Sequence, residues 1–383
     1  MRTSSLLLLL APFAVAACGS SSSPASPIDS GPADSAPLTS DAGDDSAGED
    51  STDASSCNGD AACETLSWSA SPVISRKRNH HAIVLAQTAA GPFLYTLGGY
   101  DGSSGVLPNV DRVPIQSDGS LGAWVADEAL TVPVAGHIGE VVSNVIVVAG
   151  GTMASQAVTD SAYSAVIGSD GSLGAWTAAG SVGHPRMHAG SFVNGNTIYV
   201  MGGFQDPNVW DDAVMATVQP DGTVSAWTSA GMLPGPMSHF SVSFVDGYVY
   251  LAGGLAMSAF DNPPDLAAVW RASLATDGTL TGWTAMTPLS VANAVHGSFV
   301  HGGYLYVAGG VTGTATAVIE DRVWRAPIAA DHTLGAWQDA PKLPVARAHV
   351  HKLPVFQGLV YSIAGSIDFS LDSTSEIDIG SFP

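Results

Sequence analysis

The amino-acid sequence predicts an all-β fold, a closed six-bladed β-propeller, on three observations. A seven-residue motif that begins with aspartate and ends with tryptophan recurs every 51 to 56 residues, a period typical of propeller blades. Its copies are residues 118–124, 170–176, 221–227, 277–283 and 331–337. Pairs of small residues recur in step with it, beginning at Gly98, Gly150, Gly202, Gly253, Gly309 and Ala364. Six tryptophans complete the pattern: Trp68, Trp124, Trp176, Trp227, Trp283 and Trp337.

Each period contains four short β-prone segments in the same order. In the third period these are a histidine-bearing segment (188–193), an apolar run that ends in two glycines (198–203), a third run (213–218) and the tryptophan segment. The first two are separated by Asn194-Gly195 and the last two by Asp221-Gly222. Such dipeptides favour tight hairpins, so each period predicts four antiparallel strands.

The two ends of the repeat region are out of phase with each other. Trp68 precedes the first glycine pair, whereas no tryptophan segment follows the last third-strand segment, residues 375–380. We therefore expect the segment around Trp68 to add the fourth strand to the C-terminal blade. This closes the ring and leaves no open edge between the first and last blades.

The order of an aromatic strand, a loop, a histidine about 12 residues later and a glycine pair resembles the kelch repeat, the architecture of the galactose-oxidase central domain. The resemblance covers residues 64–383. The sequence departs from the common pattern in its Asp-Gly-Ser-Leu-Gly-Ala-Trp hairpin and in having basic residues before the histidine in only some repeats. Galactose-oxidase-like copper enzymes use a tyrosine cross-linked to cysteine, and no cysteine follows residue 63. We therefore expect no such cofactor, and no other.

The N-terminus predicts an exported lipoprotein. Residues 1–17 have one charge, Arg2, and a short apolar core, which indicates a secretory signal rather than a membrane span. Val15-Ala16-Ala17-Cys18 resembles a bacterial lipobox, which implies acylation of Cys18; ordinary cleavage that leaves a free cysteine is the alternative. In such lipoproteins Gly19 implies transport to the outer membrane. We expect the lipid to be the only membrane attachment.

Residues 18–56 predict a disordered tether, because serine, alanine, proline, aspartate and glycine cannot bury enough apolar surface to fold. Calcium binding by its aspartates is an alternative that lacks a loop of defined ligand spacing. The propeller domain is expected over residues 57–383. Cys57 and Cys63 at its start predict a local disulfide in an exported chain, since no further ligands of zinc-site spacing lie nearby. We expect no metal site.

Charge excludes one class of partner. Residues 64–383 hold about 25 acidic and 11 basic groups. A net charge of about −14 opposes nucleic-acid binding, which depends on lysine and arginine contacts to phosphates.

Strand directions place the expected binding site. The connections between strands one and two and between strands three and four are short, so the long connections of all blades share the other face. Loops often carry function, and we expect a ligand there, around the mouth of the central channel.

The recurring histidines begin the first strands at this rim: His81, His137, His188, His239, His296 and either His349 or His351. A ring of imidazoles suggests metal binding or pH sensing, but the kelch resemblance implies a structural hydrogen-bonding role.

Other candidates near this face are charged or aromatic. Arg78, Arg186 and Arg347 precede histidines and Glu140 follows one; they would bind an anionic ligand or form salt bridges. Candidate contacts for a glycan or protein in the loops are Trp210, Asp211, Asp212, Phe260 and Asp261. Alternatively, Trp210 aligns with Trp270 and Trp324 on the third strands, and core packing then explains all three.

Three functions remain open. The first is a non-catalytic binding module for a protein or carbohydrate, because the sequence contains no Gly-x-Ser-x-Gly elbow, phosphate loop or His-Glu-x-x-His motif. The second is a sugar-modifying enzyme similar to the kelch-like sialic-acid mutarotases, with Glu140, arginine and histidine groups at the channel mouth. A purely structural role in the envelope is a third option.

Overall fold

A computed structural model describes residues 66–256, 266–313, 316–369 and 372–382. These residues form no helix, and their main elements are six four-stranded antiparallel sheets, which we number as blades 1 to 6. Blade 1 contains β2 (Ala82–Thr88), β3 (Gly91–Leu97), β6 (Val110–Pro114) and β7 (Val125–Ala126). Blade 2 contains β9 (Ile138–Val142), β10 (Val145–Ala149), β12 (Ser161–Val166) and β13 (Thr177–Ser181).

The other four sheets repeat this order. Blade 3 contains β14 (Gly190–Asn194), β15 (Thr197–Met201), β18 (Asp212–Thr217) and β19 (Thr228–Met232). Blade 4 contains β20 (Ser241–Val245), β21 (Tyr248–Ala252), β22 (Val269–Leu274) and β23 (Leu280–Ala285). Blade 5 contains β25 (Gly297–His301), β26 (Tyr304–Ala308), β29 (Val323–Pro327) and β30 (Gln338–Ala340). Blade 6 contains β31 (Val355–Phe356), β32 (Leu359–Ile363), β33 (Ile377–Ser381) and β1 (Ser67–Ser71).

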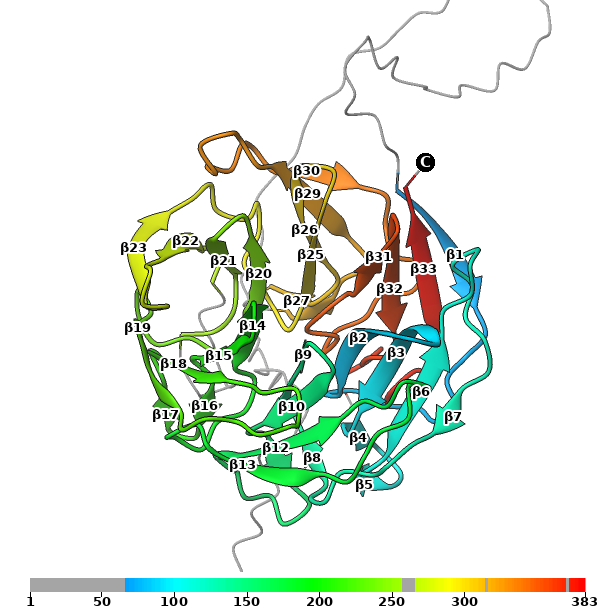
Figure 1. Ribbon diagram of the computed structural model, residues 1–383. Helices are drawn as coiled ribbons and strands as arrows, with labels where there is room; N and C mark the ends of the chain where they lie inside the picture. The colour runs from blue at the N-terminus through cyan, green and yellow to red at the C-terminus, as the bar shows by residue number, and fades with distance from the viewer. Residues whose placement is uncertain (1–65, 257–265, 314–315, 370–371, 383) are drawn as a thin grey trace, which may run out of the picture. The chain divides into compact units, whose positions relative to one another are not determined.

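The sheets are arranged in a ring with the first strand of each blade innermost (Figure 1). Neighbouring inner strands contact one another from β2 through β9, β14, β20 and β25 to β31. The main apolar clusters lie between adjacent blades rather than within one sheet. The protein therefore has a ring of inter-blade cores around an axial channel, as expected for a propeller.

The predicted closure of the ring is confirmed. Strand β1 pairs antiparallel with β33, with Trp68 opposite Gly380. The Trp68 indole N–H also donates to the carbonyl of Pro341 in blade 5, at 3.0 Å. N-terminal and C-terminal segments therefore share one sheet, and separating them would expose the edge of β33.

The glycine pairs explain how the blades approach one another near the axis. Gly202 and Gly203 have positive φ values of 58° and 87°, a conformation that glycine adopts at little cost. A Cβ atom on Gly202 would lie 2.5 Å from the carbonyl oxygen of Met237 in the next blade. Both conformation and space therefore require glycine here, as the sequence pattern predicted.

The tryptophans connect adjacent outer strands. Five of them donate the indole N–H to a backbone carbonyl of the preceding blade, at 2.7 to 3.0 Å. These pairs are Trp68–Pro341, Trp176–Glu128, Trp227–Ala179, Trp283–Met232 and Trp337–Thr287. The sequence predicted their packing between blades but not this bond. The sixth, Trp124, has a buried indole nitrogen with no partner among the described residues.

This difference gives a test of the indole bond. Trp227→Phe keeps most of the apolar surface but removes the donor to Ala179, so we expect a loss of about 1 kcal/mol in unfolding free energy. Trp124→Phe removes a donor that has no described partner and should cost less. Chemical denaturation of both variants measures this, and equal losses would show that the bond contributes nothing.

The Asp-Gly turns between strands three and four also join blades. In Asp118 and its four equivalents, the carboxylate accepts the backbone N–H two residues later, which fixes the turn. A side chain of the preceding blade then donates a hydroxyl to a carbonyl of four of the five turns, at 2.6 to 2.9 Å. These pairs are Tyr95–Gly171, Ser164–Gly222, Tyr250–His332 and Tyr361–Gly119.

Candidate functional site

One residue at the axis precedes each inner strand in the left-handed conformation. These residues have φ values between 51° and 66° and are His80, Gly136, His188, His239, Val295 and His349. From Gly136 onward, each donates its backbone N–H to the carbonyl of the equivalent residue in the preceding blade, at 2.7 to 3.0 Å. This axial belt joins the blades at their narrowest point. Left-handed non-glycine residues are uncommon, so the belt is held by the surrounding structure.

Five imidazoles gather at the belt and form an axial histidine cluster: His80, His188, His239, His349 and His351. The rings of His80 and His349 stack with centroids 3.8 Å apart, and those of His188 and His239 at 3.9 Å. His351 Nε2 lies 3.3 Å from His188 Nδ1. The rings therefore occupy the channel at the end that faces the long connections.

Neighbouring side chains orient three of these rings through Nδ1. The partners are Asn79 Oδ1 for His80 at 2.6 Å, Ser238 Oγ for His239 at 2.8 Å and Ser366 Oγ for His349 at 3.2 Å. Burial lowers the pKa of all five histidines, well below 6.5 for the belt members and to about 4 for His351. The cluster is therefore neutral at pH 7.

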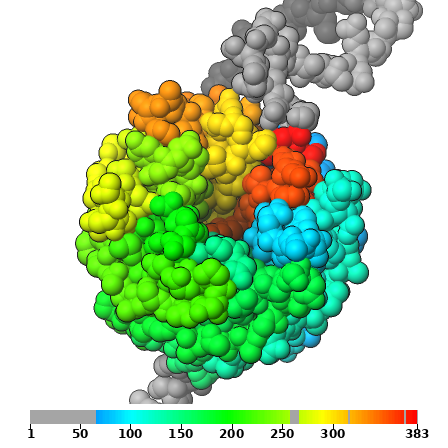
Figure 2. Space-filling model, viewed as in Figure 1, coloured from blue at the N-terminus to red at the C-terminus, as the bar shows by residue number. Residues whose placement is uncertain are grey.

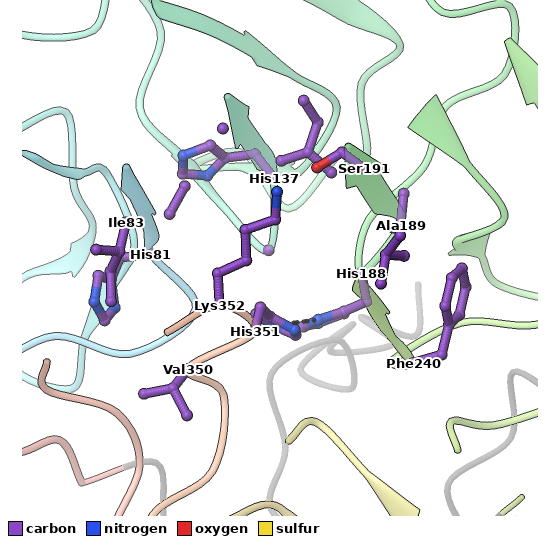
Figure 3. A pocket seen from close by; sticks show the side chains of 16 residues that line it. His81, Ile83, His137, His188, Ala189, Ser191, Phe240, Val350, His351 and Lys352 are labelled. Atoms are coloured by element: carbon purple, nitrogen blue, oxygen red, sulfur yellow. Dashed lines mark hydrogen bonds between the residues drawn. The ribbon is translucent and has the colours of Figure 1, made fainter. Parts of the chain in front are cut away.

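The histidines do not form the single ring that was expected, because they occupy two adjacent positions of the repeat. His188, His239 and His349 belong to the belt, whereas His81, His137 and His296 each follow the belt residue of their blade. The second group packs against glycine pairs; a Cβ on Gly98 would lie 2.9 Å from His137. Burial lowers the pKa of His137 and His296 to about 3. All three are buried, and His81 and His137 line a small pocket beside His188 and His351 (Figure 3).

The stacked rings do not converge on a common point. Within the described ranges, no group of three or more histidine, cysteine, aspartate or glutamate side chains is placed to hold a metal ion. Imidazole lone pairs lie in the ring plane, so face-to-face stacking directs them past one another. The rings of the cluster pack against one another.

Blade 6 departs from the others where it meets the channel. The segment from the belt residue to the end of the second strand is one residue longer in blade 6, from His349 to the end of β32, than in blades 2 to 5. Strand β31 is only two residues long. The extra length brings His351 and Lys352 into the channel (Figure 3). Lys352 forms an ion pair with Glu140 of blade 2. Its backbone also bridges to Ser298 of blade 5. Lys352 thus connects three blades.

The open part of the channel lies on the opposite side of the cluster from the long connections. A cavity of about 360 Å³ is lined by the later residues of the inner strands, among them Glu140, Ser243, Phe244, Ser298 and Lys352. Figure 2 shows a hollow near the middle of the ring. Glu140 is thus close to the channel as expected, but at the hairpin end and already paired.

The arginines are structural. Arg186 is buried, donates to Asp212 Oδ2 at 2.8 Å and donates to the carbonyl of Gly202 at 2.9 Å. Arg78 and Arg347 make the same pair with Asp111 and Asp378. Of the two alternatives for Arg186 and Arg347, the structure shows the salt bridge. Asp212, a loop candidate, is the partner of Arg186, and Asp378 is the partner of Arg347.

The loop candidates have different outcomes. Trp210 is half-buried, stacks on His184 with centroids 4.2 Å apart and donates to the carbonyl of Pro185. It is not equivalent to Trp270 and Trp324, because Val214 occupies that register in blade 3. Asp211 is half-buried beside it. Phe260, Asp261, Cys18, Cys57 and Cys63 lie outside the described residues, as do the predicted signal and tether.

Comparison with known proteins supports the fold. The chain is 25% identical over 193 residues to the kelch-like protein terF of Aspergillus terreus, which covers 48% of this chain and 40% of that protein. It is 28% identical over 177 residues to beta-scruin of Limulus polyphemus, covering 45% and 18% respectively. The solved structure of YjhT superimposes with a TM-score of 0.63 at 13% identity, covering 80% of this chain and 95% of that one. The described residues form a kelch-type β-propeller.

The matches to the two curated proteins are partial. No family model matches the chain. The chain spans less than half the length of the two curated relatives. Among the described residues, no helix is long and apolar enough to cross a membrane.

The long-loop face of the kelch-type propeller carries small folded hairpins. They are formed by β4 (Tyr100–Asp101) with β5 (Gly105–Val106), by β16 (Phe204–Gln205) with β17 (Asn208–Val209), and by β27 (Val311–Thr312) with β28 (Val318–Ile319). In blade 2, β11 (Thr152–Met153) pairs with β8 (Val134–Ala135) and Thr152 bridges to Val158. In blade 5, β24 (Asn293–Ala294) pairs with β27, and in blade 6 Ser366 bridges to Ser373.

Each connection is also fixed at its start. Its first residue pairs with the segment just before the axial belt, as in Asn79 with Tyr100 and Met187 with Phe204. The described part of this face is therefore pre-organised. The sequence predicted where these loops lie but not their internal pairing, because strands of only two residues are too short to show a periodic pattern of apolar residues.

Proposed function

We propose that this protein is an exported, lipid-anchored binding module that presents its long-loop face to a protein or carbohydrate ligand, without catalysis. The observation that carries the proposal is the set of hairpins on that face. A surface that is ordered before binding loses less conformational entropy when a partner docks. A propeller fold alone does not define a function, whereas an ordered loop surface provides a place for a partner to bind.

Exposed apolar side chains favour a protein partner. Among the described residues, the exposed large apolar side chains are Val73, Val125, Met232, Val318 and Ile367. Val73, Val318 and Ile367 lie in the long connections, whereas Val125 and Met232 lie on outer strands. These three side chains are the apolar contacts that a protein partner would cover on that face.

The exposed residues supply a matched experiment. Val318→Asp and Val125→Asp change the same side chain at the same exposure, 49%. Ile367→Asp and Met232→Asp form a second pair. The mature protein would be used to capture ligands from envelope extracts and on a glycan array. We expect the two loop variants to reduce binding of the captured ligand at least tenfold and the two outer-strand variants to leave it unchanged.

Two outcomes would contradict this assignment. Equal binding by all four variants would remove the long-loop face from the interaction. Absence of any protein or glycan ligand would contradict the binding module itself.

Anchoring is a separate part of the proposal and rests on the lipobox-like sequence. We expect the wild-type protein to sediment with outer membranes and to incorporate labelled fatty acid. Cys18→Ser should abolish the incorporation and release the protein. Retention of the variant in the membrane fraction would contradict a lipid anchor.

The enzymatic alternative rests on the cavity near Glu140. Its carboxylate and Lys352 line a space of about 360 Å³, so acid–base chemistry on a small sugar is the second candidate. NMR measurement of anomer exchange with several free sugars tests it. Acceleration by the wild type but not by Glu140→Gln would favour the enzyme, and no acceleration would exclude it.

A further inference from the structure

A second surface feature lies between blades 3 and 4, on the hairpin face. A groove of about 630 Å³ separates the β14–β15 hairpin from the Asp-Gly turn of blade 4. Six of its lining residues carry side-chain amides or hydroxyls: Asn194, Asn196, Thr217, Ser225, Thr228 and Thr276. Tyr199 and Met215, opposite each other on β15 and β18, complete the lining.

The groove occurs where an inter-blade contact is missing. Four of the five Asp-Gly turns accept a hydroxyl from the preceding blade, three of them from the tyrosine equivalent to Tyr199. The Tyr199 residue is 2% exposed, and its hydroxyl lines the groove without the bond to the turn that the three equivalent tyrosines make. A Cβ on Gly278 would lie 3.0 Å from this hydroxyl, so it sits beside the turn without bonding to it.

The Tyr199 hydroxyl lines the groove, so a ligand can use its donor and acceptor positions in place of solvent. Tyr199 is therefore a donor and acceptor held in position by a buried ring. The surrounding amides and hydroxyls likewise both donate and accept, which is the pattern that complements a chain of sugar hydroxyls. The Met215 side chain offers an apolar contact.

We propose that this groove binds a neutral oligosaccharide. Among the described lining residues there is no lysine or arginine, and the carboxylate of Asp277 would repel anionic groups. The open groove suits a chain of sugars rather than one enclosed ring. This site is separate from the long-loop face and does not depend on the function proposed for it.

Two tyrosines at equivalent positions provide the test. The mature protein, Tyr199→Phe and Tyr95→Phe would be titrated with neutral hexasaccharides of glucose and of N-acetylglucosamine in calorimetry, after an array identifies the better linkage. Loss of one hydrogen bond of about 1.4 kcal/mol corresponds to a tenfold change in Kd. We expect Tyr199→Phe to weaken binding about tenfold with little change in Tm. Tyr95→Phe, which loses its bond to Gly171, should lower Tm and leave binding unchanged.

Thr217→Val is a second test of the groove, because it removes one hydroxyl at nearly constant side-chain volume. A weaker affinity in this variant supports the proposal. Binding that neither Tyr199→Phe nor Thr217→Val alters would overturn it, as would binding of extended peptides but no oligosaccharide. A ligand bound at the long-loop face leaves these two variants unaffected, so the two proposals can fail separately.

Discussion

Acidification to pH 5 to 6 is expected to unfold the propeller. Eight histidines are buried and have pKa values lowered by that burial: His80, His81, His137, His188, His239, His296, His349 and His351. In the unfolded chain their pKa returns to about 6.5. Below that pH the unfolded state binds more protons than the folded state, so the free energy of unfolding falls as pH decreases.

The size of the effect follows from the number of groups. By pH 5.5 each such histidine lowers the free energy of unfolding by about 1 kcal/mol, and domains are stable by only about 5 to 15 kcal/mol. Above pH 7 these groups are neutral in both states and contribute no pH dependence. Circular dichroism and denaturant titrations between pH 8 and 4.5 measure the curve.

Blade 4 suggests the control for this experiment. Phe240 occupies there the position that His137 occupies in blade 2, against the equivalent glycine. His137→Phe should therefore fold and should make the pH dependence shallower by about one proton. A wild-type protein with the same unfolding free energy at pH 7 and pH 5 would contradict neutral, buried histidines.

Arg347→Met is expected to cost about 3 to 5 kcal/mol, because it leaves the buried Asp378 carboxylate without its counter-charge. The arginine also donates to the carbonyls of Ala364 and Glu376, so it connects the end of β32 with the start of β33. The double variant Arg347→Met with Asp378→Asn should lose less than the sum of the single variants. Urea denaturation gives these values.

A surface pair is the matched control. Lys342 and Asp321 form an ion pair with side chains 61% and 39% exposed. Lys342→Met should change the unfolding free energy by less than about 1 kcal/mol. If Arg347→Met were equally mild, the buried pair would not be a structural element of the blade.

Much of the fold could be predicted because repetition amplifies weak signals. A single Asp-Gly turn or glycine pair is ambiguous, but six copies in phase define strand order, and the displaced Trp68 predicted the closing strand. The site was harder, because histidines one residue apart in phase look alike in a sequence. His80, the neighbour of His81, was missed for this reason. The positive φ of the one residue before each inner strand is seen only in the structure.

Two other features could not be predicted from the sequence, because they depend on tertiary contacts. The role of Arg186 follows from its pairing with Asp212, 26 residues later, and the equivalent pairs Arg78–Asp111 and Arg347–Asp378 differ in spacing because the loops differ in length. The entry of His351 and Lys352 into the channel comes from one extra residue in blade 6. That insertion is visible in the sequence, but its direction is set by Glu140 and Ser298 of other blades.

The most direct test of the binding surface is hydrogen–deuterium exchange of the mature protein with and without the protein ligand captured from envelope extracts. We predict slower exchange in residues 100–106, 204–209 and 311–319, with unchanged exchange in the hairpins at residues 194–197 and 275–279. Protection confined to those hairpins, or to the inner strands around Glu140, would contradict a long-loop binding face.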